Sequence, residues 1–336
     1  MKVSILVPVY GVEKYIERCA RSLFEQTYED LEYIFVDDCS PDNSIEILKN
    51  TLENYPKRKE QVKIIHHDKN QGLSGARNTA LSHATGDYVI FVDSDDEVCR
   101  SCIDDMEGPL GTSGKEVDFV VADFNPVGFY NAQSALNLKQ GLYNGDDIFD
   151  TYCNYDWYIM AWNKLVNRQF MLKNNLLFYP GIIHEDALWS FQLASIAKSM
   201  LVVSKETYIY YCNPGSIMTS VAAKRDVRDC LTIIREMQKI VTEKKLDIFK
   251  SWNRLGAIFS RAERFMKELD YNNYKIYRIL RQNDISKFRE KVRWCFCGKG
   301  FHPNRFHSLL PTPLGYAYRS MYSSLRNKLA HKNSHN

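Results

Sequence analysis

A short acidic cluster follows an apolar run at residues 88–96, which read YVIFVDSDD. Asp93 and Asp95, with Ser94 between them, crowd two carboxylates and a hydroxyl directly after five apolar residues. Hard divalent cations that also bind phosphate oxygens are the usual reason why such crowding is tolerated. The Asp-x-Asp spacing therefore predicts a metal-diphosphate site. A plainer interpretation, equally open for the motif alone, is that the acids end a strand and cap the next helix.

Polar groups follow three other stretches that read as strands. They are residues 8–10, the pair Asp37 and Asp38, and the glycine-containing segment 72–78. Open parallel sheets bind ligands beyond the carboxyl ends of their strands, so convergence on one rim is more specific than any single motif. The chain has neither a GxGxxG motif after its first strand nor a Walker A motif, and must hold a nucleotide in another way.

Such a rim requires a parallel sheet between layers of helices. The run at 88–92 does not alternate with polar residues, so both faces of this strand should be covered. Pro8 is expected to end central pairing in the first strand. Strands separated by amphipathic helices specify a doubly wound α/β fold. Further strands are predicted at 3–9, 31–36 and 62–65, and residues 70–78 as a loop that runs into a helix ending near Gly86.

After residue 96 the pattern is less regular. Short strands are predicted at 118–122, 200–204 and 207–211, helices at 145–152 and 185–197, and residues 160–170 match neither pattern. Beyond residue 220 the spacing is helical, at 226–242, 249–269 and 272–280. We therefore expect an α/β catalytic domain over residues 1–220 and a C-terminal helical region over 221–336.

The composition is that of an ordinary globular chain, with 45% hydrophobic residues and a net charge of +3 that gives no support for a nucleic-acid partner. No run of eighteen apolar residues is present. Nine cysteines without a framework spacing, and a start that leads directly into a strand, predict a reducing, cytoplasmic location. Cys99/Cys102 and Cys295/Cys297 lack the second pair of ligands that a zinc site needs, which favours free thiols.

The C-terminal tail is strongly basic. From residue 285 onwards ten Lys and Arg stand against one acid, Glu290, and Trp294 and Phe296 lie among them. This mixture suits anionic headgroups, so peripheral contact with the inner face of the cell membrane is predicted; a solvated basic face is the alternative. The basic residues are Lys287, Arg289, Lys291, Arg293, Lys299, Arg305, Arg319, Arg326, Lys328 and Lys332.

The sequence resembles the family 2 nucleotide-sugar glycosyltransferases, which have the GT-A fold. The matching segments, in the family's order, are VSILVPVYGVEKYI, EYIFVDDCSPDNS, NQGLSGARNTAL, GDYVIFVDSDD and GIIHEDALWS. They lie within residues 2 to 220, and a string of spaced motifs is improbable by chance. The resemblance implies a GT-A-type, Rossmann-like, doubly wound mixed sheet, with the C-terminal helical region as an appendage.

The resemblance also implies how a nucleotide-sugar donor is held. Pro8, Val9 and Tyr10 look like the strand edge beside the base and ribose. Asp38 looks like the carboxylate that accepts the N–H of the base, and Gly72 permits an unusual backbone turn.

The next two motifs, which contain Arg77 and the acidic cluster, look like the contacts to the phosphate end of the donor. Arg77 looks like a contact to the phosphates or to the acidic cluster, with a plain salt bridge as the alternative. Asp93 would lie beside the ribose, and Ser94 would be a further contact to the nucleotide-sugar. Asp93 and Asp95 would bind Mg²⁺ or Mn²⁺, with Asp95 as the ligand of an ion that bridges the diphosphate.

Transfer to an acceptor hydroxyl needs a base, and the resemblance makes Asp186 the candidate. Glu185, His184 and Lys164 would shape the acceptor site. The alternative is that Glu185 and Asp186 only satisfy the positive N-terminal end of their helix. Three aromatic residues are candidates for stacking on sugar faces, with core packing as the alternative: Trp157, Tyr158 and Trp162.

The implied activity is an inverting, metal-dependent transfer of a sugar from a nucleotide-diphosphate donor, UDP being the expected nucleotide. The acceptor would be a hydroxyl of a glycan or lipid-linked glycan in polysaccharide biosynthesis. A catalytically inactive glycan-binding or scaffold homologue is the first alternative. The second is a sugar-nucleotide pyrophosphorylase, whose glycine-rich, arginine-bearing first loop is absent from VPVYGVEKYI.

Overall fold

The computed structural model describes residues 1–113, 116–128, 136–213, 223–264, 271–284, 310, 313–318 and 321. The chain divides into two compact units, Met1–Thr219 and Ser220–Asn336, and each is described by itself. The functional division into a catalytic domain and an appendage stays a prediction.

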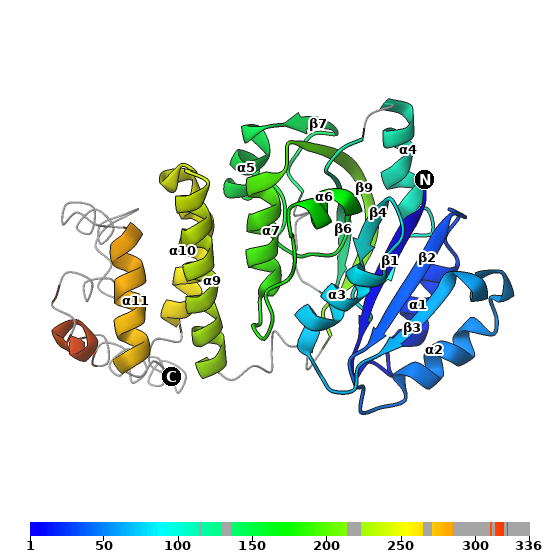
Figure 1. Cartoon of the computed structure of the whole chain (residues 1–336), viewed down its shortest axis with the longest axis horizontal. Helices are drawn as coiled ribbons and strands as arrows, with labels where there is room; N and C mark the ends of the chain where they lie inside the picture. Colours follow the sequence, from blue (N-terminus) through cyan, green and yellow to red (C-terminus); the bar gives the residue numbers. More distant parts are fainter. Residues whose placement is uncertain are drawn as a thin grey trace, which may run out of the picture. The chain divides into compact units, whose positions relative to one another are not determined.

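In the described part of the first unit, nine strands form one sheet. They are β1 (Val3–Val9), β2 (Leu31–Asp37), β3 (Val62–His66), β4 (Tyr88–Phe91), β5 (Glu97–Val98), β6 (Phe119–Val127), β7 (Gly141–Asn144), β8 (Lys164–Asn167) and β9 (Ser199–Tyr211). Their order is β3-β2-β1-β4-β8-β6-β9-β5, with β7 paired to β9 (Figure 1). The first four strands in this order are parallel, β8 runs antiparallel between β4 and β6, and β6 and β9 are parallel. The sheet is therefore mixed.

The central strand β1 is buried along its whole length, and so is β4. Pro8 still pairs in register with Val36, so β1 continues beside β2. The β4 side of β1 pairs only as far as Leu6, whose carbonyl accepts from Val92 N–H at 3.0 Å. Successive residues of a strand point their amides to opposite sides, so Pro8 faces the same side as Leu6, where pairing with β4 has ended, and the predicted end of central pairing is confirmed.

Helices connect the strands of the first unit. They are α1 (Ile16–Phe24), α2 (Ser44–Leu52), α3 (Gly72–His83), α4 (Cys102–Ser113), α5 (Asp146–Cys153), α6 (Arg168–Lys173) and α7 (Glu185–Ile196), with a 3₁₀ helix at Pro56–Gln61. The buried stripe of α1 recurs every three or four residues, which is the pattern that covers a sheet face. Helix α3 packs on β1 and β2 and begins at Gly72, so most of the predicted loop at 70–78 is already helical.

Two further assignments differ from the prediction. The two strands expected at 200–204 and 207–211 are one strand, β9, whose register against β6 shifts on either side of Asp123. This irregularity lies near Lys205 and Glu206, the polar residues between the two predicted strands. The unassigned segment at 160–170 contributes the buried strand β8 and the start of α6.

The second unit contains α9 (Ala223–Glu243), α10 (Ile248–Arg264) and α11 (Tyr271–Asp284), and α9 packs against both of the others. Polar contacts join these helices: Arg261 Nη2 donates to the buried Asp226 at 2.6 Å, and Tyr277 Oη donates to Glu263 at 2.5 Å. The predicted helical pattern is confirmed here, although residues 265–269 lie outside the described residues. Among described residues, no helix has the length and apolar character needed to cross a bilayer.

We predict that Gly86→Ala destabilises the first unit. An added Cβ would lie 2.6 Å from Ser4 Oγ, 2.8 Å from Ser4 N and 2.9 Å from the carbonyl oxygen of Lys2, and the two backbone atoms cannot rotate away. Overpacking of this kind typically costs about 1–3 kcal/mol, which urea denaturation would detect. Gly108→Ala is the matched control, because its Cβ would meet no atom within 4 Å. Equal stability of the two variants would contradict the prediction.

Candidate active site

The carboxyl ends of β1, β2 and β4 bring the predicted donor-site residues to one rim of the sheet. Val9 and Asp37 are partners in register, and Asp38 N–H donates to the Val9 carbonyl at 2.9 Å. Pro8 and Val9 are buried within the sheet or at its end, whereas Tyr10 is 52% exposed just beyond β1. Tyr10 is therefore the side chain of this strand end that a ligand can reach.

The acidic motif forms a tight turn, closed by a hydrogen bond of 3.1 Å from Asp96 N–H to the Asp93 carbonyl. Ser94 and Asp96 are buried, while Asp93 and Asp95 are partly exposed. Burial, and then the neighbouring Asp93 carboxylate, raise the pKa of Asp95. Burial, Asp95 and Asp93 together raise the pKa of Asp96 to about 8. The turn thus concentrates negative charge that a cation would stabilise.

A divalent metal ion fits the chemistry of these donors. Asp93 and Asp95 offer hard carboxylate oxygens, and one oxygen of Asp95 accepts from Asn213 Nδ2 at 3.1 Å. Within the described parts of the chain, no group of three or more His, Cys, Asp or Glu is placed to hold a metal ion. An ion at Asp93 and Asp95 would therefore need further oxygens from a diphosphate and water, as Mg²⁺ commonly does.

Arg77 joins this turn to a second acidic pair. Its Nη2 donates to Asp93 at 2.6 Å and its Nη1 donates to Glu185 at 2.7 Å, while the side chain is only 2% exposed. Burial lowers the pKa of Arg77, but the carboxylates of Asp93 and Glu185 raise it above its usual value, so the guanidinium stays charged. Arg77 therefore contacts the acidic cluster through ion pairs, which fits both interpretations left open for it, and its contact with a phosphate stays a prediction.

Glu185 and Asp186 open helix α7, directly after His184, which caps the helix in the left-handed conformation with φ 60°. Burial and the Glu185 charge raise the pKa of Asp186 to about 7, although Arg77 opposes the shift. One oxygen of Asp186 accepts from Ala187 N–H at 2.8 Å. That contact fits the helix-capping alternative, but the raised pKa is also what a general base near neutral pH requires. The roles of all three residues stay predictions.

Asp38 is more deeply engaged than its predicted contact with a base implies. It is 2% exposed, and its carboxylate accepts from Gln71 N–H at 2.7 Å and Gly72 N–H at 2.8 Å and lies 2.7 Å from His67 Nδ1. Its oxygens therefore hold the start of α3, where Gly72 adopts φ +77°. His67, whose Nε2 lies 2.9 Å from Thr79 Oγ1, was not among the predicted site residues. Its only sequence signal was its position after β3.

Lys164 and the three candidate stacking residues lie in the core instead of at an exposed rim. Lys164 is completely buried, donates to the Met160 carbonyl and lies 3.9 Å from the Tyr158 ring centroid. Trp157, Tyr158 and Trp162 are buried as well, with Trp162 stacked on Tyr208 at 4.4 Å. The core-packing alternative therefore holds for all three aromatic residues. Any effect of Lys164 on an acceptor is indirect.

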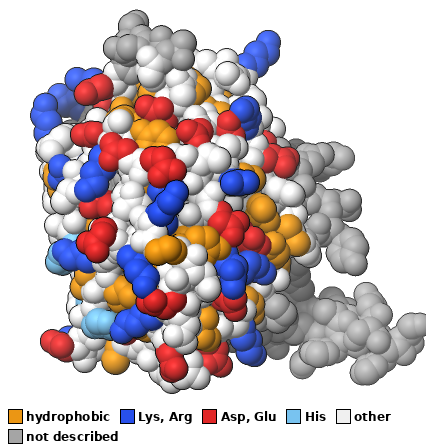
Figure 2. Space-filling model, turned by 90° about the vertical axis from the view of Figure 1, so that its right-hand side faces the viewer, with side chains coloured by type: hydrophobic (Ala, Val, Ile, Leu, Met, Phe, Trp, Pro, Cys, Tyr) orange, Lys and Arg blue, Asp and Glu red, His pale blue; other side chains and the backbone are white. Residues whose placement is uncertain are grey.

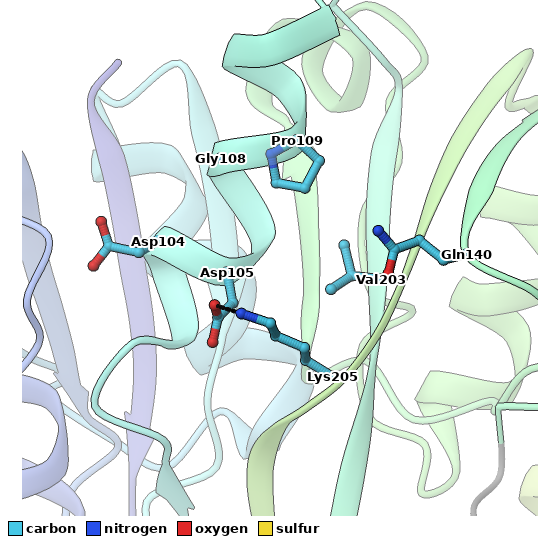
Figure 3. A pocket seen from close by; sticks show the side chains of 7 residues that line it. All are labelled: Asp104, Asp105, Gly108, Pro109, Gln140, Val203 and Lys205. Carbon is cyan, nitrogen blue, oxygen red and sulfur yellow. Dashed lines mark hydrogen bonds and ion pairs between the residues drawn. The ribbon is translucent and has the colours of Figure 1, made fainter.

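A cleft of about 640 Å³ lies away from this rim (Figure 3). Its charged side chains are already paired, because Lys205 donates to Asp105 and Asp104 accepts from Thr27 Oγ1. Figure 3 shows the lining residues drawn from α4, β9 and the Gln140 segment, none of them a predicted site residue. The lining residues are Asp104, Asp105, Gly108, Pro109, Gln140, Val203 and Lys205.

Three further expectations concern nucleic-acid binding, the cysteine thiols and the basic tail. On the face that Figure 2 shows, described Lys and Arg side chains alternate with Asp and Glu and do not gather into an area of one charge. Cys99 and Cys102 are free thiols, as expected. The basic tail from residue 285 lies outside the described residues except at 310, 313–318 and 321, so its predicted membrane contact stays a prediction.

Solved structures share this fold. Residues 1–349 of TarS from S. aureus superpose with a TM-score of 0.69 at 18% identity, covering 96% of this chain and 92% of that chain. TarS has also been solved with UDP-GlcNAc, with a TM-score of 0.60 and 20% identity over 88% of this chain and 91% of that chain. A mannosyltransferase from Pyrobaculum calidifontis, solved with GDP-Man and Mn²⁺, gives 0.54 at 14% identity over 96% and 87%. The predicted GT-A-like α/β fold is confirmed.

Sequence relatives identify the family. The chain is 32% identical over 225 residues to an uncharacterized glycosyltransferase of Escherichia coli K12, YibD, covering 64% of this chain and 63% of YibD, slightly under two thirds. A putative glycosyltransferase of Bacillus subtilis 168, EpsH, is 30% identical over 284 residues, covering 80% of this chain and 73% of EpsH. The sequence model named Glycosyl transferase family 2 matches residues 4–174. The chain therefore belongs to glycosyl transferase family 2.

Proposed function

We propose that this chain is an inverting, metal-dependent glycosyltransferase that moves a sugar from a nucleotide-diphosphate donor to a hydroxyl group. The observation that carries the proposal is the Arg77 bridge, which holds Asp93 at 2.6 Å and Glu185 at 2.7 Å in one buried ion-pair network. The network brings the acidic turn, which suits a metal and a diphosphate, next to Glu185 and Asp186. The pKa of Asp186 is raised to about 7. A donor site and a base within one network are what glycosyl transfer needs.

The proposed reaction is a single displacement. The acceptor oxygen forms a bond to the anomeric carbon while the bond from that carbon to the diphosphate oxygen breaks, and the diphosphate leaves with the electron pair. Asp186 takes the proton of the acceptor hydroxyl, because an alcohol is a poor nucleophile until that proton is removed. Attack opposite to the leaving group inverts the anomeric centre.

Asp93 and Asp95 would hold Mn²⁺ or Mg²⁺ together with the diphosphate. When bound, the ion neutralises charge that develops on the leaving diphosphate. The chain's own contribution is to orient these carboxylates, which Arg77 does for Asp93 through a hydrogen bond of 2.6 Å. The Mn²⁺ in the structure of the Pyrobaculum mannosyltransferase supports this part of the proposal by likeness of fold only.

The donor is proposed to be a UDP-sugar and the acceptor a glycan or lipid-linked glycan. Exposed Tyr10 at the end of β1 and Ser94 in the acidic turn are the proposed contacts to the nucleoside. The complex of TarS with UDP-GlcNAc supports a UDP donor, again through fold alone. Polysaccharide assembly at the cytoplasmic side of a bacterial membrane is the proposed setting, with the basic residues beyond 285 as the membrane contact.

The first test is calorimetric titration with UDP, GDP and CMP, each with Mn²⁺ or with EDTA. We expect UDP to bind in the presence of Mn²⁺, and Asp95→Asn to weaken this binding by at least about 100-fold while leaving weak binding in EDTA unchanged. Asp105→Asn is the matched control, since Asp105 is also a partly exposed aspartate but lies on α4, where it pairs with Lys205. UDP binding of equal strength in Mn²⁺ and in EDTA would overturn the metal assignment. If none of the nucleotides binds, a scaffold protein is favoured.

We predict that Asp186→Asn lowers the rate of transfer by about 10²–10⁴-fold and leaves UDP affinity unchanged, because only the base is removed. Asp147→Asn is the control for a loss of negative charge in the first turn of a helix, since Asp147 holds that place in α5. A rate loss shared by both variants would support the helix-capping interpretation. Until an acceptor is identified, slow hydrolysis of the UDP-sugar provides the rate.

The raised pKa of Asp186 predicts the pH dependence of this rate. A carboxylate whose pKa is about 7 is protonated below that pH and accepts no proton, so kcat/KM for the donor should rise about tenfold per pH unit up to pH 7 and then level off. The residual rate of Asp186→Asn should not show this rise with pH. A rise that persists in the variant would assign the titration to another group.

A further inference from the structure

The third acid of the turn, Asp96, has a different environment from Asp93 and Asp95. It is 1% exposed, and both of its oxygens accept hydrogen bonds from the end of β9. Tyr208 Oη donates to Oδ2 at 2.8 Å and Tyr211 N–H donates to Oδ1 at 2.8 Å. Asp96 is therefore turned away from solvent and unavailable as a direct ligand.

The hydroxyl of Tyr208 connects Asp96 to Asp93. It accepts the backbone N–H of Asp93 at 3.2 Å while it donates to Asp96. A phenol has only one hydrogen, so its orientation is set by the acceptor on Asp96, and its lone pair is left for the Asp93 amide. Two hydrogen bonds thus hold the backbone of the turn, one from Asp93 N–H to Tyr208 Oη and one from Asp96 N–H to the Asp93 carbonyl.

Tyr208 is itself fixed in place. Its ring is completely buried and stacks on Trp162 with centroids 4.4 Å apart and an interplanar angle of 4°. In the sheet order, β9 is separated from β4 by β8 and β6, but the short strand β5 that follows the turn pairs with β9 and places Val98 opposite Tyr208. The tyrosine therefore reaches the acidic turn from a rigid part of the core.

We propose that Asp96 and Tyr208 are positioning residues for the metal and diphosphate site, which fix the backbone of the turn so that the carboxylates of Asp93 and Asp95 point to one place. This inference rests on the proposed function. An aspartate suits the position because both of its partners are donors, whereas an asparagine would offer one acceptor oxygen and an NH₂ group that faces a donor. Partners outside the direct ligand shell typically influence metal affinity by 10–100-fold, so the expected effect is measurable.

The test compares two conservative tyrosine variants. Tyr208→Phe removes only the hydroxyl and keeps the ring on Trp162. Tyr158→Phe is the control, because Tyr158 belongs to the same aromatic cluster, is buried, and has its Oη 2.8 Å from the carbonyl oxygens of Ala122 and Asn163, away from the acidic turn. The readouts are UDP affinity by calorimetry in Mn²⁺ and in EDTA, and the thermal midpoint.

We expect Tyr208→Phe to weaken UDP binding in Mn²⁺ by about tenfold and to leave binding in EDTA unchanged, with Asp96→Asn behaving alike where it folds. Tyr158→Phe should lower the thermal midpoint without changing metal-dependent affinity. Wild-type affinity of Tyr208→Phe in Mn²⁺, or an equal loss in Tyr158→Phe, overturns the inference while the proposed function stands. A wild-type chain that binds no UDP with Mn²⁺ overturns the proposed function and the inference together.

Discussion

The candidate active site depends on one buried positive charge, the guanidinium of Arg77. Asp93, Glu185 and Asp186 come from segments about a hundred residues apart, and gathering their charges out of water is costly unless an opposite charge lies among them. Arg77 supplies that charge, with one nitrogen on Asp93 and another on Glu185, and its guanidinium lies 5.1 Å from the Phe178 ring centroid. Removing one partner of a buried pair typically costs about 3–5 kcal/mol, so the two halves of the site are stable only together.

The position of Arg77 is set by the sheet through a short chain of contacts. Asp38 follows β2 and accepts the first amides of α3, and His67 follows β3 and supports the same carboxylate. Helix α3 then carries Arg77 toward β4 and α7. Parallel strands end at the same rim, so a polar residue after each strand is sufficient to build this arrangement. Asp38 illustrates how a conspicuous acid at a strand end can stabilise a helix start.

The acids of the rim differ in what surrounds them. Asp93 and Asp95 are partly exposed and suited to a ligand, whereas Asp96 is buried against β9. The family match ends at residue 174, before Glu185 and Asp186, and the ion pair between Arg77 and Glu185 is one physical link between the matched region and the proposed base. Burial raises the pKa of both Asp186 and Asp96, but both oxygens of Asp96 are held by β9 through Tyr208 and Tyr211.

The sequence by itself determined the α/β class, the four parallel strands and the helix at Glu185, because apolar runs and helical spacing are local signals that the native contacts reinforce. It also marked the rim, since acids directly after buried strands can only lie at strand ends. Only the tertiary structure decided that β9 is one strand, that Lys164 and Trp162 are core residues, and that Tyr208 holds the acidic turn. These facts depend on how strands that are distant in the sequence pair and pack, and hydrophobic spacing carries no information about which distant partner a side chain will meet.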